Sequence, residues 1–220
     1  MEIRPKPDLI IFDCDGVLVD SELLSCRCLS DELSEFGISL TLAQAIELFL
    51  GRSTSAITQY YRERGHAVPV DFPVRLKSRV LTAFEKALQP IPEVDTVLSS
   101  LGVPHCVASS SDLDRVALSL KVTGLAPHFG TRIYTAQMVA HGKPAPDLFL
   151  YAAEKMGAQP ARTLVIEDSV SGVQAGKAAG MMVWGFVGGS HYRRRDGQAI
   201  LSGAGADRVF ARMSDFGKDV

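Results

Sequence analysis

The apolar residues of the chain change their spacing from one region to the next, and the first run of them is continuous. Residues 9–12 read Leu-Ile-Ile-Phe, a short and β-prone stretch without polar positions. Such a run is typical of a strand that is buried on both faces, as in the middle of a parallel sheet. It stops at residues 13–16, Asp-Cys-Asp-Gly, where the glycine permits a sharp change of backbone direction. We therefore expect a buried strand followed by an acidic turn.

In residues 21–88 the apolar residues recur at helical spacing throughout. Thr41 and Ser53 are suited to begin helices as N-caps, and Gly51 is suited to end one. The pattern predicts four helices, over residues 23–36, 42–50, 54–64 and 74–88. Because no convincing strand interrupts them, we expect this region to be a small all-helical domain.

From residue 89 onward, predicted strands alternate with predicted helices. The strands are expected over residues 105–108, 132–134, 163–166, 181–187 and 209–210. The helices are expected over residues 93–101, 113–120, 147–156 and 169–179. This alternation predicts a parallel sheet with right-handed crossover connections. Residues 1–20 and 89–220 should therefore form one α/β core, with residues 21–88 inserted after its first strand.

The composition excludes several classes of function. The 220 residues carry a formal net charge of −2, so no overall field favours nucleic acid or an anionic membrane as a partner. No apolar run approaches the roughly 18 residues of a membrane span, and the first ten residues lack the apolar stretch of a signal peptide. The four cysteines form no C-x-x-C pair and match no zinc framework. Free thiols without an export signal predict a cytoplasmic protein. The sequence does not predict the oligomeric state.

The two carboxylates after the first predicted strand are candidates for metal binding. Asp13 and Asp15 are one residue apart, and two like charges about 4 Å apart repel by roughly 4 kcal/mol at an effective dielectric of 20. A bound cation would relieve this repulsion, and the ligand sites of open α/β sheets lie beyond the carboxyl ends of the strands. The alternative is a simple acidic turn, because Asp and Gly are common turn formers.

Three further segments place polar groups at predicted strand ends or helix starts. They are Ser109-Ser110-Ser111, Lys143 and Glu167-Asp168. In a doubly wound sheet they would meet the two aspartates at one edge. With a divalent cation, the carboxylates would form the oxygen site that magnesium prefers. Lys143 and the N–H groups of Ser110 and Ser111 could then hold phosphate oxygens.

Together these groups predict phosphoryl transfer. One carboxylate can attack as a nucleophile, and a second can serve as general acid and then as general base. Each segment also has a simpler explanation: a turn with an N-cap for the serines, a solvated side chain for the lysine, and a helix cap for the last acidic pair. These separate explanations do not account for the shared placement of the segments, which all occur in order at predicted strand ends.

The same segments resemble the four motifs of the haloacid dehalogenase superfamily, the aspartyl-phosphate phosphatases and phosphomutases. The matching stretches are Asp13-Cys14-Asp15-Gly16-Val17, Val107-Ala108-Ser109-Ser110, Lys143-Pro144-Ala145-Pro146-Asp147, and Ile166-Glu167-Asp168-Ser169 with Gly172, Ala175 and Gly176. The resemblance covers the chain outside residues 21–88. It implies a Rossmann-like core with a small helical cap inserted after the first motif. The subgroup resembled contains β-phosphoglucomutase, phosphoglycolate phosphatase and several sugar-phosphate phosphatases.

The resemblance also implies a role for each acidic residue of the motifs. Asp13 matches the nucleophile and a metal ligand. Asp15 matches the general acid and base, and its main-chain carbonyl matches a magnesium ligand. Asp168 matches the direct magnesium ligand, while Glu167 matches a residue that binds the metal directly or through water.

Further positions are implied to bind the substrate. The phosphate-binding positions match Ser109, Ser110 and Lys143. Gly51 and Arg52 resemble the cap loop that faces the active site in the family, so we expect Arg52 and its neighbours to recognise the substrate. Glu22 matches the hinge between core and cap.

We therefore expect a magnesium-dependent phosphatase that hydrolyses a small phosphorylated metabolite, such as a sugar phosphate, through an aspartyl-phosphate. The rival is a phosphomutase like β-phosphoglucomutase, whose relatives carry a histidine ten residues after the acid/base aspartate and an arginine three residues after the cap-loop glycine. This chain has Ser25 and Thr54 at those positions, although Arg52 is a candidate replacement for the arginine. A non-catalytic binding protein is disfavoured because the motif residues are intact. The substrate itself is not predicted, because specificity lies in the cap loops.

Overall fold

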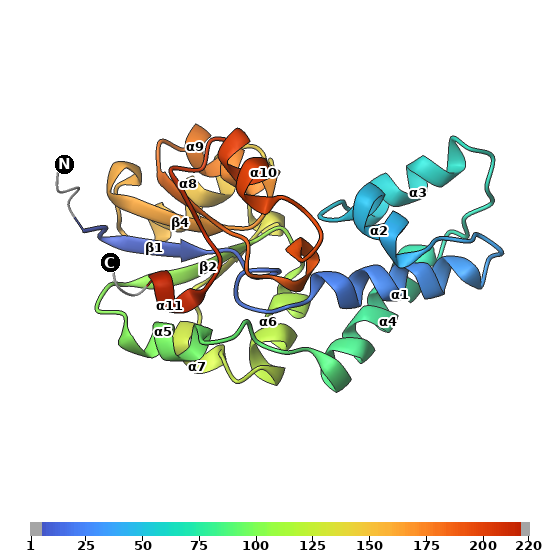
Figure 1. Cartoon of the computed structure of the whole chain (residues 1–220), viewed down its shortest axis with the longest axis horizontal. Coiled ribbons are helices and arrows are strands. Elements are labelled where there is room, and N and C mark those ends of the chain that lie inside the picture. The colour runs from blue at the N-terminus through green and yellow to red at the C-terminus, as the bar shows by residue number, and fades with distance from the viewer. Residues whose placement is uncertain (1–5, 217–220) are drawn as a thin grey trace. The chain divides into compact units, whose positions relative to one another are not determined.

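The computed structural model describes residues 6–216, which divide into two units (Figure 1). The described residues up to 20 and from 89 onward belong to the first unit, and residues 21–88 form the second. The chain leaves the first unit at Asp20 and returns at Gln89. There the Asp20 N–H donates to the Gln89 carbonyl at 3.0 Å, so the two ends of the inserted segment are adjacent within the first unit.

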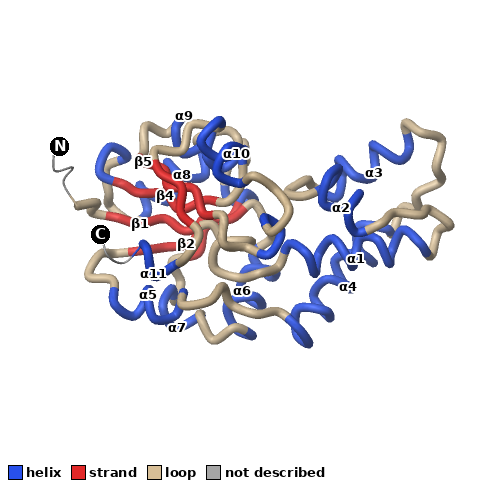
Figure 2. The backbone as a smooth tube through the Cα atoms, in the orientation of Figure 1, coloured by secondary structure: helices blue, strands red, loops and turns tan. Residues whose placement is uncertain are grey.

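A six-stranded parallel sheet forms the centre of the first unit and is drawn in red in Figure 2. Its strands are β1 (Leu9–Phe12), β2 (His105–Ser109), β3 (Ile133–Thr135), β4 (Thr163–Glu167), β5 (Met182–Phe186) and β6 (Arg208–Phe210). The strand order β3-β2-β1-β4-β5-β6 places β1 between β2 and β4. Every residue of β1 and β4 is buried, as expected when helices cover both faces of a parallel sheet.

Helices pack on both faces of this sheet (Figure 1). They are α5 (Val94–Ser100), α6 (Leu113–Val122), α7 (Ala126–Phe129), α8 (Asp147–Lys155), α9 (Val170–Ala178), α10 (Gly197–Gly203) and α11 (Met213–Phe216), with 3-10 turns η1 (Ala136–Met138), η2 (Pro160–Arg162) and η3 (Ser190–Tyr192). On one face, Ile11 belongs to the same core cluster as Leu148 of α8 and Val173 of α9. On the other, the Phe12 ring lies edge-on to Phe216 of α11, with ring centroids 5.9 Å apart. None of the helices within residues 6–216 has both the length and the apolar character needed to cross a membrane.

The second unit consists of the helices α1 (Glu22–Ser34), α2 (Leu42–Phe49), α3 (Thr54–Arg62) and α4 (Phe72–Ala87). Thr41 and Gln44 form a capping box at the start of α2, and Ser53 caps α3 by accepting from the Ala56 N–H. Helices α1 and α4 are joined through Glu32, which is only 1% exposed. Its carboxylate accepts from the Nε atoms of two arginines of α4, Arg75 at 2.6 Å and Arg79 at 2.7 Å.

The α/β class and the parallel sheet predicted from the sequence are confirmed, with small differences at element ends. Helix α4 begins at Phe72 rather than near residue 74, because Pro73 lies in its first turn, where proline needs no hydrogen-bond partner. Three short helices were not predicted, namely α7, α10 and α11. Helix α10 is capped by Asp196, which accepts from the Ala199 N–H at 3.0 Å.

Candidate active site

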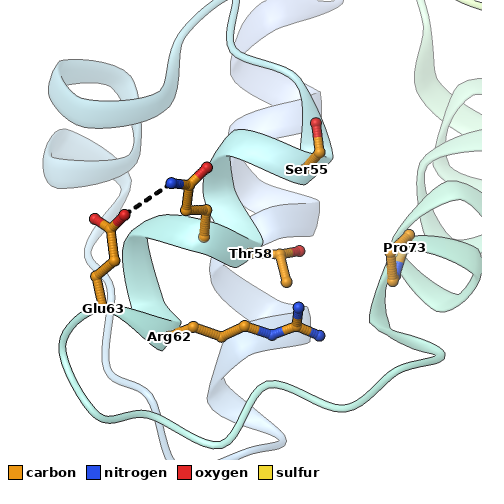
Figure 3. A pocket seen from close by; sticks show the side chains of 6 residues that line it. Ser55, Thr58, Arg62, Glu63 and Pro73 are labelled. Carbon is orange, nitrogen blue, oxygen red and sulfur yellow. Dashed lines mark hydrogen bonds between the residues drawn. The ribbon is translucent and has the colours of Figure 1, made fainter.

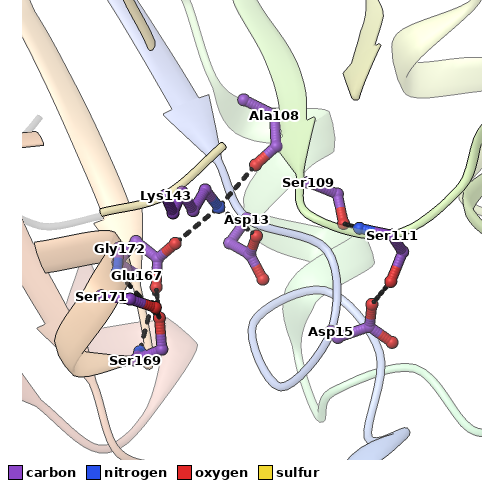
Figure 4. Close-up of polar contacts among 10 residues, drawn as sticks. All are labelled: Asp13, Asp15, Ala108, Ser109, Ser111, Lys143, Glu167, Ser169, Ser171 and Gly172. Carbon is purple, nitrogen blue, oxygen red and sulfur yellow. Dashed lines mark hydrogen bonds and ion pairs between the residues drawn. The ribbon is translucent and has the colours of Figure 1, made fainter. Parts of the chain in front are cut away.

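The predicted site residues of the core meet at the carboxyl ends of three adjacent strands. Strand β1 pairs with β2 on one side and β4 on the other, with Phe12 opposite Val107 and Ile166. Asp13 therefore leaves the sheet beside Ser109, the last residue of β2, and beside Glu167, the last residue of β4. The sequence prediction that these groups converge at one sheet edge agrees with this geometry (Figure 4).

Lys143 connects two of the carboxylates. Its Nζ donates to Asp13 Oδ1 at 2.5 Å, to Glu167 Oε1 at 2.6 Å and to the Ala108 carbonyl at 2.9 Å. Only 2% of its side chain is exposed, so the alternative of a solvated surface lysine is wrong. Burial alone would lower the pKa of Lys143, but the carboxylates of Asp13 and Glu167 raise this pKa above its ordinary value. The ammonium group is therefore charged and fixed between two acids.

Both oxygens of the Glu167 carboxylate accept from the chain itself. Oε1 accepts from Lys143, and Oε2 accepts from the N–H and Oγ of Ser169, each at 2.9 Å. A Cβ at Gly172 would lie 1.8 Å from Glu167 Oε1, so a glycine is needed there for the carboxylate to fit. In this structure Glu167 supports Lys143 and the start of α9. The N-cap of that helix is Ser169, which accepts from the Gly172 N–H.

Asp13 and Asp168 are buried carboxylates with too little positive charge around them. Burial raises the pKa of Asp13 well above its ordinary value, and Glu167 and Asp168 raise it further, against the opposing effect of Lys143. Burial likewise raises the pKa of Asp168, and the Glu167 and Asp15 carboxylates add to the rise. A divalent cation bound at this edge would stabilise both ionised carboxylates.

The donor set suits a cation that prefers oxygen ligands. The buried carboxylates of Asp13 and Asp168 are hard donors of the kind magnesium selects. Within the described part of the chain, no group of three or more His, Cys, Asp or Glu side chains is arranged to hold a metal. The ligand set expected from the sequence is Asp13, Asp168, the main-chain oxygen of Asp15, and Glu167 either directly or through water.

The carboxylate of Asp15 is held by two residues of the segment that follows β2. Ser111 donates its Oγ at 2.6 Å, and Arg115 of α6 donates Nη2 at 2.7 Å. Figure 4 shows the Asp15 side chain pointing to Ser111 rather than to Lys143. The Ser111 N–H donates to Ser109 Oγ at 3.1 Å, while Ser110 is exposed. Arg115 is not among the site residues predicted from the sequence; the available signal was a cation in the first turns of the helix after the serine loop.

His191 was also missed. It lies in η3, after β5, and is only 4% exposed. Its Nε2 lies 3.2 Å from Asp168 Oδ2. The sequence predicts only a loop in this region, because its Gly188-Gly189 pair and basic run do not indicate a buried imidazole.

The three substrate-binding positions predicted outside the core lie in the second unit. Glu22 is the first residue of α1. Gly51 has a φ of +70° and lies with the exposed Arg52 in the turn between α2 and α3. Their part in substrate recognition stays a prediction.

The second unit has a pocket of its own, of about 460 Å³, along α3 (Figure 3). It is lined by Ser55, Thr58, Gln59, Arg62, Glu63 and Pro73. Gln59 donates to Glu63 at 2.8 Å on its rim. None of the predicted site residues lines this pocket.

The chain is similar to known proteins over most of its length. Residues 10–186 match the family described as haloacid dehalogenase-like hydrolase. The 6-phosphogluconate phosphatase of Escherichia coli (strain K12) is 28% identical over 186 residues, which cover 84% of each chain. The fructose-1-phosphate phosphatase of the same organism is 34% identical over 179 residues, which cover 78% of this chain and 92% of that protein.

A solved structure shows the same fold with ligands present. It is a haloacid dehalogenase family hydrolase from Deinococcus radiodurans R1, 36% identical, with a TM-score of 0.79. The match covers 97% of this chain and 94% of that one. That protein was crystallised with bound phosphate and sodium.

Proposed function

This chain belongs to the haloacid dehalogenase-like hydrolases, and on that premise we propose that it is a magnesium-dependent phosphatase of a small sugar phosphate. Relatives named as phosphatases match most of its length, and it is a phosphoric monoester hydrolase that acts on a phosphorylated metabolite. The observation that carries the finer proposal is the contact of Lys143 with Asp13 and Glu167 beside Asp168. A buried carboxylate with a fixed ammonium group beside it is suited to act as a nucleophile toward a phosphate dianion.

In the proposed reaction, Asp13 attacks the phosphorus of the substrate. A bond forms between its carboxylate oxygen and phosphorus, and the bond from phosphorus to the sugar oxygen breaks. Asp15 gives a proton to the leaving oxygen and afterwards takes a proton from water. That water attacks the aspartyl-phosphate, which releases inorganic phosphate and restores the Asp13 carboxylate.

Lys143 has two tasks in this proposal. Its ammonium group attracts the oxygens of the incoming phosphate, and its contact with Asp13 favours the ionised form of the nucleophile. Glu167 supports it by holding the same Nζ from the other side. Ser109 and the N–H groups of the loop after β2 are proposed to bind the remaining phosphate oxygens.

The metal would be held by the side chains of Asp13 and Asp168 and by the main-chain oxygen of Asp15. When bound, Mg²⁺ supplies positive charge that offsets the repulsion between the phosphate and the carboxylates. Glu167 is proposed to contribute through water, because its two oxygens already accept hydrogen bonds from the chain.

The substrate class is proposed from the relatives. Two of them are named for the sugar phosphates 6-phosphogluconate and fructose 1-phosphate. Glu22, Gly51 and Arg52 are proposed to contribute to selection among such sugars, since Arg52 offers a planar cation suited to anionic or hydroxyl-rich groups.

A hydrolysis screen tests the proposal. The purified protein is incubated with a panel of sugar phosphates and Mg²⁺, and inorganic phosphate is measured. We expect release from at least one sugar phosphate, and none from an Asp13→Asn variant. The exposed Asp31→Asn variant on α1 serves as the matched control and should keep full activity. Equal release by the Asp13→Asn and wild-type proteins would reject the proposed nucleophile.

A further inference from the structure

Three consecutive residues after β5 contact aspartates: Ser190 contacts Asp20, while His191 and Tyr192 contact Asp168 of the site. These residues lie in the segment 188–192, which follows β5. Ser190 donates from its N–H at 3.0 Å and from its Oγ at 2.7 Å to Asp20 Oδ1. His191 places Nε2 3.2 Å from Asp168 Oδ2. Tyr192 donates its hydroxyl to the main-chain carbonyl of Asp168 at 2.5 Å. Asp168 is thus held at both its side chain and its backbone.

The imidazole of His191 fits a space that two glycines leave open. A Cβ at Gly189 would lie 2.7 Å from His191 Cε1 and 2.8 Å from Nδ1. A Cβ at Gly16, whose φ is +78°, would lie 1.8 Å from Asp168 Oδ2 and 3.1 Å from His191 Cε1. The Tyr192 ring packs on the imidazole with centroids 4.3 Å apart. Because the surroundings are filled on several sides, the ring has one available orientation.

We propose that His191 is a positioning residue that orients the Asp168 carboxylate for the divalent cation, and that Tyr192 fixes the backbone of the same ligand. This inference rests on the proposed function, which makes Asp168 a metal ligand. An Nε2–H at this distance donates to the carboxylate and restricts its rotation before the cation arrives. Removal of such an outer partner typically weakens metal binding by about 10- to 100-fold.

The opposite role for His191 makes an opposite prediction. An imidazole that served mainly as a positive partner of Asp168 would compete with the cation for the same carboxylate. Its removal would then strengthen metal binding. The direction of the change in affinity therefore distinguishes an orienting ring from a competing charge.

Calorimetric titration of metal-free protein with Mg²⁺ measures this affinity without any substrate. We expect His191→Leu to weaken Mg²⁺ binding by about 10- to 100-fold. His191→Gln should restore most of it, since a glutamine amide can donate from nearly the same place as Nε2. Tyr192→Phe keeps the ring packing, loses one donor, and should weaken binding by about three- to tenfold. His128→Gln is the matched control, because this histidine contacts Asp95 and no proposed ligand.

Melting curves of the metal-free variants show whether each one folds. If His191→Leu fails to fold, His191→Asn replaces it, because this shorter amide cannot place a donor at the Nε2 position; Tyr192→Phe tests the backbone contact in either case. Wild-type affinity in all folded variants, or tighter binding in His191→Leu, overturns the inference. A wild-type protein that neither binds Mg²⁺ nor releases phosphate would instead reject the proposed function, and this inference with it. Wild-type binding and turnover, together with unchanged affinity in the variants, would reject the inference alone.

Discussion

At the scale of single residues, Asp13 and Asp15 share a sequence motif but have different surroundings. Asp13 is 7% exposed and contacts an ammonium group, whereas the Asp15 carboxylate is turned toward Ser111 and Arg115. Two carboxylates with such different partners can serve different steps of one reaction. The proposed division of nucleophile and acid/base between them leads to separate expectations for their variants.

Asp15→Asn should lose activity according to the leaving group. General acid catalysis typically contributes about 10²- to 10⁴-fold, so turnover of sugar phosphates should fall by about that factor. Formation of the phosphoenzyme from an aryl phosphate, whose leaving group needs no proton, should be nearly normal. Because the general base is also lost, the aspartyl-phosphate should accumulate and be visible by mass spectrometry of the intact protein. Asp13→Asn should form no phosphoprotein. A phosphorylated Asp13→Asn protein would contradict the assignment of Asp13 as the nucleophile.

The electrostatics of the same residues predict an effect of metal removal. Burial raises the pKa of Asp13 and Asp168, and neighbouring carboxylates raise it further. The negative charge of these carboxylates also opposes a phosphate dianion. A chelator should therefore abolish phosphate release, and Mg²⁺ should restore it. Ca²⁺ should restore it poorly, because it prefers longer bonds and a higher coordination number. Full activity in excess chelator would count against the metal requirement.

At the scale of secondary-structure elements, a cluster of charges holds α1 against α4. Glu32 is almost fully buried and accepts from Arg75 and Arg79, while Glu35 contacts the same arginines from a side chain that is 44% exposed. When the buried Glu32 loses its charge, the two guanidinium groups keep only the exposed Glu35 as an anionic partner. This is more costly than the loss of an exposed ion pair.

Glu32→Gln should therefore lower the free energy of unfolding of the helical unit by about 1–3 kcal/mol. The neighbouring Glu35→Gln should lower it by less than about 1 kcal/mol, because solvent weakens exposed ion pairs. Urea denaturation followed by circular dichroism compares the two variants. An equal decrease in the free energy of unfolding in both variants would show that the burial of Glu32 does not determine how much it stabilises the helical unit.

The elements also show which features a sequence reveals. Strand β1 was predicted from its continuous apolar run, and the helices α1 to α4 from apolar residues at helical spacing. Helices α7 and α11 have four residues each, too few to show a period. Lys143, Asp13 and Glu167 could be grouped because they follow the order of strand ends. Arg115 and His191 could not, since they reach the site from a helix and a 3-10 turn through contacts that span many residues.

At the scale of the whole molecule, the fate of the phosphoenzyme separates a phosphatase from a phosphomutase. A mutase must protect the aspartyl-phosphate from water and pass it to a second sugar hydroxyl. Ser25, on α1, stands where mutases of the family carry a histidine, and serine does not titrate near neutral pH. We therefore expect water to be the acceptor.

Incubation with β-glucose 1-phosphate, a trace of the 1,6-bisphosphate and Mg²⁺ checks this expectation. If the sugar is a substrate, inorganic phosphate and glucose should appear in equal amounts. Accumulation of glucose 6-phosphate without a matching amount of inorganic phosphate would establish mutase activity instead. Omission of the bisphosphate is the control, because a mutase depends on this primer and a phosphatase does not.

The hydrogen bond between Asp20 and Gln89 has a consequence for how such an enzyme can diversify. It brings together the two points at which the inserted segment leaves and rejoins the core. For the folding of the core, residues 21–88 act as one long loop whose two ends lie together. Each doubling of the length of such a loop raises the entropic cost of closing it by only about 0.6 kcal/mol. Insertions of other lengths and sequences are therefore compatible with the same sheet. The part proposed to select the sugar can therefore change in length and sequence without a change in the sheet that carries the proposed phosphate-ester chemistry.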